Sequence, residues 1–238
     1  MAKRILLCGE GPTDYGNPKY GSHDWEEGPV QPIIRKSVNG DIEFAYTTKE
    51  DIKRKRIQRR TGAKVTGHGA KSYKLCIIAE ERKDIDNIIC YVDADREQGS
   101  GKSERESRKR LQKIYNEISN GFKQFSEARS QSSIPMVPLK MIESWLLADE
   151  QAFTRCFGKP PTDFVLPEQP ELIWGNEKDP TSNHPKNYLE RVLEQYNQEA
   201  NRETFKNIAE EIDVYTLRLR CPLSVTANLN RPKADGIA

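Results

Sequence analysis

Acidic residues follow two short apolar runs that are typical of buried strands: Glu10 comes just after residues 4–8, and Asp93 and Asp95 come directly after residues 88–92. In an open parallel sheet, ligands bind at the carboxyl ends of the strands, so acids that follow different strands can converge there. Carboxylates gathered without a neutralising arginine repel one another unless a hard divalent cation lies between them. The spacing therefore predicts a Mg²⁺ or Mn²⁺ site suited to the chemistry of phosphate esters.

A plainer structural role for the same residues stays open. Glu10 would then cap a helix that begins near Pro12, and Asp93 and Asp95 would only end a strand. Asp14 leaves a similar choice between a bond at a helix N-terminus and the holding of a water molecule near a metal. The occurrence of acids after both of the best strand candidates favours the metal site.

Short apolar runs alternate with helical patterns along most of the chain. Strands are expected at 4–8, 42–48, 88–92 and 134–139, and helices at 51–60, 72–86, 104–120, 186–200 and 202–213. The glycines and prolines of residues 16–32 indicate an irregular loop, and residues 142–149 indicate the start of a helix. The alternation predicts an α/β fold with a mostly parallel sheet flanked by helices.

A change of composition divides the chain. Residues 158–185 hold six of the 14 prolines and interrupt the pattern. We therefore expect a core domain over residues 1–157 and, over residues 158–238, a Pro-rich connection with a helical C-terminal subdomain packed on the core. After residue 213 an irregular segment is expected.

Three motifs together resemble a known family. They are Gly-Glu-Gly-Pro-Thr-Asp at residues 9–14, Tyr-Val-Asp-Ala-Asp at residues 91–95 and Glu-Ser-Trp-Leu-Leu-Ala-Asp at residues 143–149. The set is similar to that of small Toprim-like proteins related to the nuclease half of OLD (overcoming lysogenisation defect) proteins. Pro-Lys at residues 185–186 and Cys-Pro-Leu-Ser at residues 221–224 extend the resemblance. A leucine stands where the family has serine directly after proline, so no role is carried over for this tail.

The resemblance implies a Toprim-like, Rossmann-like fold with a helical C-terminal extension, and a Mg²⁺- or Mn²⁺-dependent nuclease that cleaves nucleic acid, with DNA as the expected substrate. Carried over by position, Glu10, Asp93 and Asp95 would be the metal-holding and catalytic carboxylates, and Glu143 an additional ligand. The resemblance also implies an ABC- or OLD-type ATPase as partner, in cytoplasmic defence against phages. That ATPase would be a separate subunit, because this chain has no ATPase motif.

Lys140 lies three residues before Glu143, close enough to act as a catalytic residue that stabilises charge developing on a phosphate, if the strand end faces the site. The alternative is a lysine on the solvated surface. For Glu143 a functional role is preferred. For Asp149 a structural role is preferred, at a helix whose Trp145 packs in the core.

Residues 53–60 form the concentrated basic segment of the chain, with six Lys or Arg in eight residues. On a helix over residues 51–60, positions 53, 56 and 60 would line one face, which suits a phosphate backbone. The residues expected to bind nucleic acid are Lys53, Arg54, Arg56, Arg59 and Arg60. The common alternative for such a run is a charged helix face in solvent.

Composition argues against several classes of protein. Lys and Arg number 38 against 36 Asp and Glu, and the net charge of +2 excludes a strongly basic nucleic-acid coat protein. No apolar run approaches the roughly 20 residues of a membrane helix, and five scattered cysteines favour buried thiols in a reducing cytoplasm. Gly-Ser-Gly-Lys-Ser at residues 99–103 lacks the earlier glycine of a P-loop, and three isolated histidines argue against a zinc site.

Two other functions remain open beside the nuclease. One is a non-catalytic Toprim-like module that binds nucleic acid or serves as a scaffold for an ATPase. The other is a hydrolase of small nucleotides, because carboxylates that hold a divalent cation suit any phosphate. Cation binding and the range of substrates distinguish the three.

Overall fold

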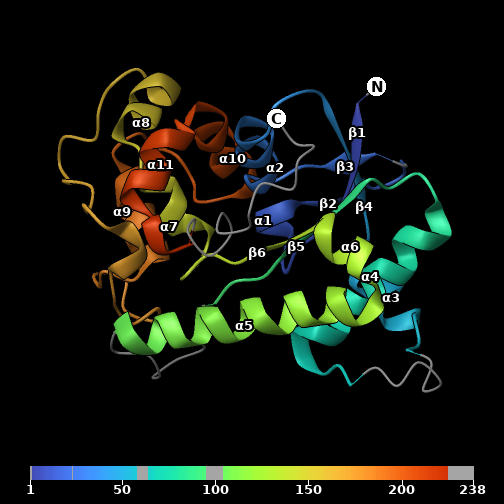
Figure 1. Ribbon diagram of the computed structural model, residues 1–238. Coiled ribbons are helices and arrows are strands. Elements are labelled where there is room, and N and C mark those ends of the chain that lie inside the picture. The colour runs from blue at the N-terminus through green and yellow to red at the C-terminus, as the bar shows by residue number, and fades with distance from the viewer. Residues whose placement is uncertain (1, 23, 58–63, 95–103, 225–238) are drawn as a thin grey trace.

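The computed structural model describes residues 2–22, 24–57, 64–94 and 104–224 (Figure 1). Its centre is a four-stranded sheet in which every pair of neighbours is parallel, in the order β4-β1-β5-β6. The strands are β1 Lys3–Cys8, β4 Ile42–Tyr46, β5 Asn87–Tyr91 and β6 Ser133–Met136. The predicted α/β fold with a parallel sheet flanked by helices is confirmed.

Helices cover both faces of the sheet (Figure 1). One face is covered by α3 Lys49–Arg54, α4 Gly67–Arg82 and α5 Glu104–Phe125. The other is covered by α2 Val30–Ser37, α7 Ile142–Leu146, α8 Glu150–Phe157, α9 Pro185–Glu194, α10 Arg202–Glu211 and α11 Val214–Arg220. Successive strand residues point to opposite faces, so Leu6 packs under the first group and Leu7 under the second. Burial on both faces explains why the β1 and β5 sequences are continuous apolar runs.

The order of the strands reverses direction beside β1. From β1 the chain passes through α2 to β4 on one side, and β5 joins β1 on the other side. The segment after β1 therefore leaves toward the α2 face, while the segment after β5 leads to α5 on the opposite face. Such a divergence of loops is where open α/β sheets bind ligands. The two acidic motifs follow these two strands.

The region from residue 16 to residue 32 is more ordered than the sequence indicated. β2 Asn17–Pro18 and β3 Trp25–Glu26 form a short antiparallel pair, and α2 begins at Val30. The ring of Trp25 stacks on Tyr46 with centroids 4.4 Å apart, and its Nε1 donates to the Tyr15 carbonyl at 2.7 Å. The expectation of an irregular loop was wrong here because aromatic packing fixes the pair, and proline is tolerated in the first turn of a helix.

The basic segment is not one helix. A capping box between Thr48 and Asp51 starts α3, but the helix ends at Arg54 and Lys55 has an extended backbone. Like charges three and four residues apart destabilise a helix, and Lys55 instead pairs with Glu81 of α4. The expected helix over 51–60 was wrong in extent, so residues 53 and 56 do not share a helix face. Arg59 and Arg60 lie outside the described residues.

The helices differ from expectation elsewhere too. The helix expected from residue 72 begins earlier, at Gly67, and the pattern at 142–149 resolves into α7 and the separate α8. Two short elements, α6 Glu127–Gln131 and the 3₁₀ helix η2 Pro170–Leu172, had no recognised pattern. The irregular segment expected after residue 213 contains α11, whose N-terminal backbone N–H groups bind the Asp213 carboxylate.

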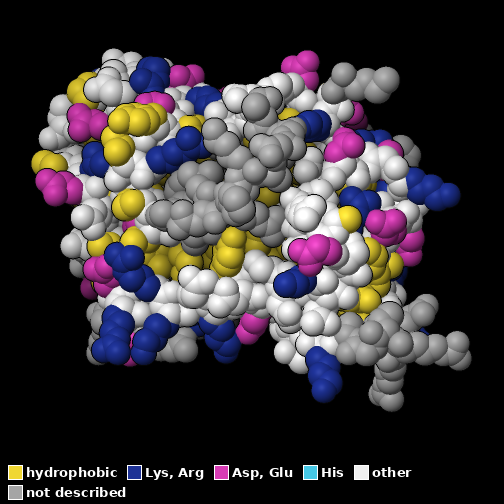
Figure 2. All heavy atoms as spheres, in the orientation of Figure 1, with side chains coloured by type: hydrophobic (Ala, Val, Ile, Leu, Met, Phe, Trp, Pro, Cys, Tyr) yellow, Lys and Arg dark blue, Asp and Glu magenta, His cyan; other side chains and the backbone are white. Residues whose placement is uncertain are grey.

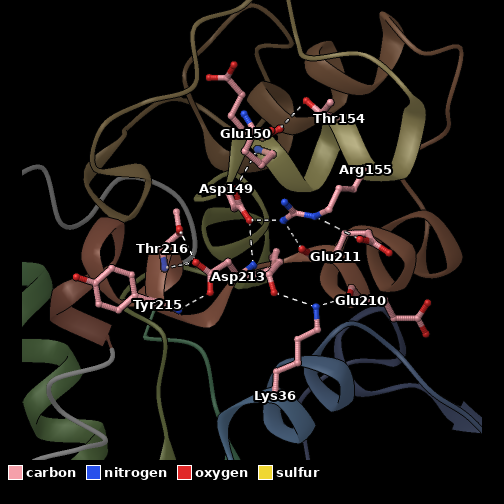
Figure 3. A network of polar contacts seen from close by, with 12 residues as sticks. Lys36, Asp149, Glu150, Thr154, Arg155, Glu210, Glu211, Asp213, Tyr215 and Thr216 are labelled. Atoms are coloured by element: carbon pink, nitrogen blue, oxygen red, sulfur yellow. Dashed lines mark hydrogen bonds and ion pairs between the residues drawn. The ribbon is translucent and has the colours of Figure 1, made fainter.

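Asp149 joins α8 to the turn before α11 (Figure 3). As the N-cap of α8 it accepts from the Gln151 N–H at 3.0 Å, and it also accepts from the Asp213 N–H at 2.9 Å. Arg155 contacts the same carboxylate at 2.9 Å. Nearby, Lys36 of α2 donates to the Ile212 carbonyl at 2.9 Å. The structural role preferred for Asp149 is confirmed.

The C-terminal helices complete the core on one face of the sheet. Leu189 and Val192 of α9 and Ile208 of α10 belong to the same hydrophobic cluster as Leu7 of β1 and Ile89 of β5. Removal of these helices would expose that face of the sheet to water. In the described part of the chain, no helix combines the length and apolar character needed to span a membrane.

The helices α4 and α5 cross where two glycines meet. A Cβ atom on Gly121 would overlap the Ser72 hydroxyl and the Gly69 carbonyl, and one on Gly69 would lie 2.8 Å from the Glu117 carbonyl oxygen. Ser72 Oγ donates to the Ile118 carbonyl at 2.8 Å across the same contact. The backbones can approach this closely only because neither glycine has a side chain.

Candidate functional site

The turn after β1 holds Glu10 at the carboxyl edge of the sheet. Gly9 is covered by the Tyr15 ring, so closely that a Cβ on Gly9 would overlap it. The Gly9 carbonyl accepts from Lys71 Nζ at 3.2 Å. α1 Pro12–Tyr15 then begins with Gly11 as its N-cap and no side-chain cap. The alternative in which Glu10 caps this helix is therefore wrong, and its half-buried carboxylate is left for the site.

Asp93 is held just beyond β5. Hydrogen bonds continue past the strand, from the Val92 N–H to the Met136 carbonyl and from the Ala94 N–H to the Pro138 carbonyl. Tyr91 Oη donates to Asp93 Oδ1 at 2.6 Å. These contacts fix the direction in which Asp93 leaves the sheet. Asp95, the second acid of the motif, lies outside the described residues.

Burial and repulsion between acids together determine the electrostatics of this edge. Burial and the nearby Glu10 raise the pKa of Asp14 to about 7, against the opposing charges of Lys186 and Lys49. Burial, then the charge of Asp14, raise the pKa of Asp93 well above its usual range, and Glu143 and Glu10 raise it further. Four acids from three separated segments therefore lie within electrostatic range of one another: Glu10, Asp14, Asp93 and Glu143.

Two lysines face this acidic group. Burial lowers the pKa of Lys71, but Cys8, Cys90 and Glu10 together raise it more, so the net pKa is above the usual value. Burial likewise lowers the pKa of Lys186. Its 2.8 Å hydrogen bond to Glu177 and the charge of Glu143 raise that pKa by more, so the net pKa is again above the usual value. Both amines therefore stay protonated at neutral pH, beside carboxylates.

Lys140 and Glu143 are both buried where the chain leaves β6. Their exposed fractions are 3% and 5%, so the alternative of a solvated surface lysine is wrong. Lys140 Nζ lies 2.8 Å from the centroid of the Trp174 ring. Glu143 stands in the first turn of α7 and acts electrostatically on Asp93 and Lys186.

The Cys-Pro-Leu-Ser tail supports the loop that carries Lys140. The Leu139 N–H donates to Ser224 Oγ at 2.7 Å, across 85 residues of sequence. Ser224 Oγ in turn donates to the buried Glu171 carboxylate at 2.7 Å, which also accepts from the Leu223 N–H at 2.7 Å. Leucine after proline is therefore accommodated, because only its backbone makes this polar contact.

The acidic group matches a divalent cation in the chemistry of its donors. Carboxylate oxygens are the ligands that Mg²⁺ and Mn²⁺ prefer, and a cation would relieve the repulsion that, together with burial, raises the pKa values of Asp14 and Asp93. Within the described residues, no three His, Cys, Asp or Glu side chains stand close enough together to hold a metal ion. Asp95, two residues after Asp93, lies outside the described residues.

The described part of the basic segment leads away from the acidic group. Lys49 at the start of α3 acts on Asp14, whereas Lys53 is exposed and pairs with Glu50 at 3.6 Å. Arg54 and Arg56 are exposed. The described part of the basic segment therefore does not enter the acidic group.

Sequence reasoning missed the two lysines of the site. Nothing in the sequence around Lys71 indicates that α4 brings it to the turn after β1. Lys186 was signalled only by the Pro-Lys motif of the resemblance. His68 was treated as isolated, yet it stands in the first turn of α4, where burial lowers its pKa and Glu10 raises it. His184 is the N-cap of α9.

Asp14→Asn is expected to reduce the dependence of stability on pH. The folded protein keeps the Asp14 proton up to about pH 7, whereas the usual carboxyl pKa is 3.8. The unfolded chain therefore binds fewer protons between these values, and the free energy of unfolding falls as the pH rises through this window. Asparagine does not titrate, so the variant should exceed the wild type most near pH 7. Urea unfolding at pH 4, 5.5 and 7 without divalent cations measures this, and an equally steep slope would contradict it.

Comparison with known proteins gives one match. The model of a family described as a domain of unknown function (DUF4276) matches residues 25–225. The matched range includes Asp93, Lys140, Glu143 and Lys186 and begins after the Glu10 turn. No curated protein and no solved structure matches the chain. Because the model covers most of its length, the chain belongs to the DUF4276 family.

Proposed function

We propose that the chain is a Mg²⁺- or Mn²⁺-dependent nuclease that cleaves phosphodiester bonds of DNA. The observation that carries the proposal is the acidic group at the carboxyl edge of the sheet beside β1, where burial and mutual repulsion raise the pKa values of Asp14 and Asp93. Buried acids that repel one another do not stabilise a fold, and strongly perturbed pKa values of this kind cluster at functional sites. The motif resemblance to Toprim-like nucleases supports the same function.

Each residue of the edge has a proposed task. Glu10, Asp93 and Asp95, with Glu143 as an additional ligand, would hold the cation. The cation would neutralise phosphate charge and lower the pKa of a water molecule. Lys140, which is buried beyond the end of β6 with its amine over the Trp174 ring, would stabilise negative charge that develops on the phosphate.

Asp14, Lys71 and Lys186 complete the proposed site. Lys71 fixes the turn that carries Glu10 through the Gly9 carbonyl and keeps its positive charge at neutral pH. Lys186 is free to exchange Glu177 for a phosphate oxygen, since that partner is near the surface. Asp14 near its pKa can accept or release a proton close to neutral pH.

The partner belongs to the same proposal. The motif resemblance supports a cytoplasmic complex with an ABC- or OLD-type ATPase that acts against phages. Stable co-elution of the chain with such an ATPase on size exclusion would support the complex. Separate elution at micromolar concentration would reject it and leave the nuclease proposal intact.

The deciding experiment is cleavage by the purified chain. We expect it to cut supercoiled plasmid or oligonucleotides with Mg²⁺ or Mn²⁺ and not with EDTA. Glu10→Gln should lower the rate at least about 100-fold, since a lost charge-stabilising group costs that much. Glu50→Gln, which alters an exposed acid on α3, should act like the wild type.

Each of the other possible results of this experiment would indicate a different function. Equal activity of the wild type and Glu10→Gln would remove the mechanism. Hydrolysis of free nucleotides alone would identify a small-nucleotide hydrolase. Binding of nucleic acid without cation binding or cleavage would identify a non-catalytic module.

A further inference from the structure

A groove lies on the side of α4 that faces away from the acidic group. Its volume is about 510 Å³, within the roughly 300–1,000 Å³ usual for ligand sites. Tyr73, Ile77 and Glu81 line it at successive intervals of four residues along α4. Lys71, which reaches the Gly9 carbonyl, lies two residues from Tyr73 and so points in a different direction. The groove is therefore separate from the acidic group, although both use α4.

The floor of the groove is aromatic and aliphatic. Phe125, at the end of α5, packs edge-to-face on Tyr73 with ring centroids 5.2 Å apart and an interplanar angle of 77°. Tyr73 is buried, whereas Phe125 and Ile77 are only half-buried and present apolar surface to the groove. Figure 2 shows hydrophobic side chains at the surface in the region of α3, α4 and α6. This floor suits a flat, apolar group.

The rim of the groove is positively charged. Arg54, Lys55 and Arg56 line it from the end of α3. Glu81 is the acid of the lining, and Lys55 neutralises it in an ion pair. Among the described residues, Arg54 and Arg56 have no ion pair of their own, so two guanidinium groups remain available for phosphate. Arg54 is the last residue of α3, and Lys55 and Arg56 follow it.

We infer that this groove binds an unpaired base of single-stranded nucleic acid, with the flanking phosphates on Arg54 and Arg56. The inference rests on the proposed function and adds the form of the substrate. Single-strand binding sites combine cationic grooves with aromatic surfaces on which bases stack. A base inside a duplex is covered by its neighbours and cannot reach the floor, whereas the face of an unpaired base is free. The groove therefore selects single strands, frayed ends or flaps.

The first test measures charge. Binding of a fluorescein-labelled oligo(dT) and of a duplex of equal length is followed by anisotropy in EDTA, so that no cleavage is needed. Each phosphate contact to a single strand contributes roughly 0.7 to the slope of log affinity against log salt. The double variant Arg54→Gln/Arg56→Gln loses two such contacts, so its slope should be smaller than that of the wild type by about 1.4. Lys109→Gln/Lys113→Gln is the matched control on the exposed face of α5, and it should leave the single-strand slope unchanged.

The second test fills the groove without changing charge. Ile77→Trp should weaken single-strand binding about 5- to 150-fold, the range for loss of one base stack. Duplex binding should stay within about 2-fold of wild type. Leu219→Trp, an exposed position on α11, is the control for an added ring. A circular dichroism melt confirms that both variants fold.

The outcomes separate this inference from the nuclease. Selective loss of single-strand binding in Ile77→Trp supports the groove whether or not the wild type cleaves DNA. Equal loss for single strand and duplex, or an equal change in the lysine control, would overturn it and indicate diffuse charge attraction. If Ile77→Trp fails to fold, an unchanged salt slope in the arginine variant overturns the inference by itself.

Discussion

Asp93→Asn is expected to abolish cleavage and at the same time to stabilise the protein. The charge of Asp93 is needed to hold a cation, so the rate should fall about 1,000-fold or more, at the upper end for loss of one charge-stabilising group. Burial and the neighbouring acids raise the pKa of Asp93 well above its usual range, which means that the charged form is disfavoured in the fold. Asparagine removes that charge and keeps an oxygen that can accept from Tyr91 Oη.

The expected gain in stability is about 0.5–2 kcal/mol, the usual range for a single stabilising substitution. For a chain of this size, that corresponds to a rise in Tm of about 2–4 °C for each kcal/mol. Single-turnover cleavage and scanning calorimetry without cation at pH 7 measure the two effects.

The matched control is Asp86→Asn at the opposite end of the same strand. Asp86 is exposed and accepts from the Arg4 N–H at 2.7 Å, a bond that asparagine can also accept. This variant should keep wild-type activity and show no rise in Tm. If Asp93→Asn lost stability, or cleaved as fast as the wild type, the acidic group would be structural.

Gly121→Val is expected to cause the largest loss of stability. The added side chain would overlap the Gly69 carbonyl, a backbone atom that cannot turn aside, and the Ser72 hydroxyl. The two helices must then separate and lose the bond from Ser72 to the Ile118 carbonyl. Overpacking costs about 1–3 kcal/mol, and we expect the upper end of that range. Tm should fall by about 6–12 °C, using about 2–4 °C for each kcal/mol.

Asn120→Val separates this effect from the propensity of valine for helices. Asn120 is the exposed neighbour of Gly121 on α5, so valine there is equally β-branched and meets no facing helix. Its Tm should change by less than about 2 °C, as for an ordinary surface substitution of under about 0.5 kcal/mol. Similar melting of both variants would show that the two helices do not touch as described.

The sequence indicates those features that depend on local pattern. The apolar runs of β1 and β5 are buried on both faces, so their composition was sufficient to predict an α/β fold with acids at the strand ends. Glu10 and Asp93 therefore lie where they were expected. The length of α3 was not predictable from helical spacing, because repulsion among its basic residues and the pairing of Lys55 with Glu81 end it early.

Long-range contacts account for what sequence reasoning missed. Lys71 comes to the Gly9 carbonyl across 62 residues, and no pattern near either residue indicates that approach. The β2–β3 pair depends on Trp25 finding Tyr46, which again is a tertiary contact. Asp95, Arg59 and Arg60 lie outside the described residues, so their predicted roles stay predictions.

The contact between Ser224 and Leu139 has a consequence for synthesis on the ribosome. Chains fold from the N-terminus as they emerge, so β1, β5 and β6 can pair before Ser224 has been made. The loop that carries Lys140 then lacks the hydroxyl that holds the Leu139 N–H, and Glu171 lacks its donors. In a nascent chain, the segments that carry Glu10, Asp93 and Glu143 are therefore complete before the loop of Lys140 gains this contact. The loop of Lys140 is therefore the part of the proposed site whose supporting contact comes last in the order of synthesis.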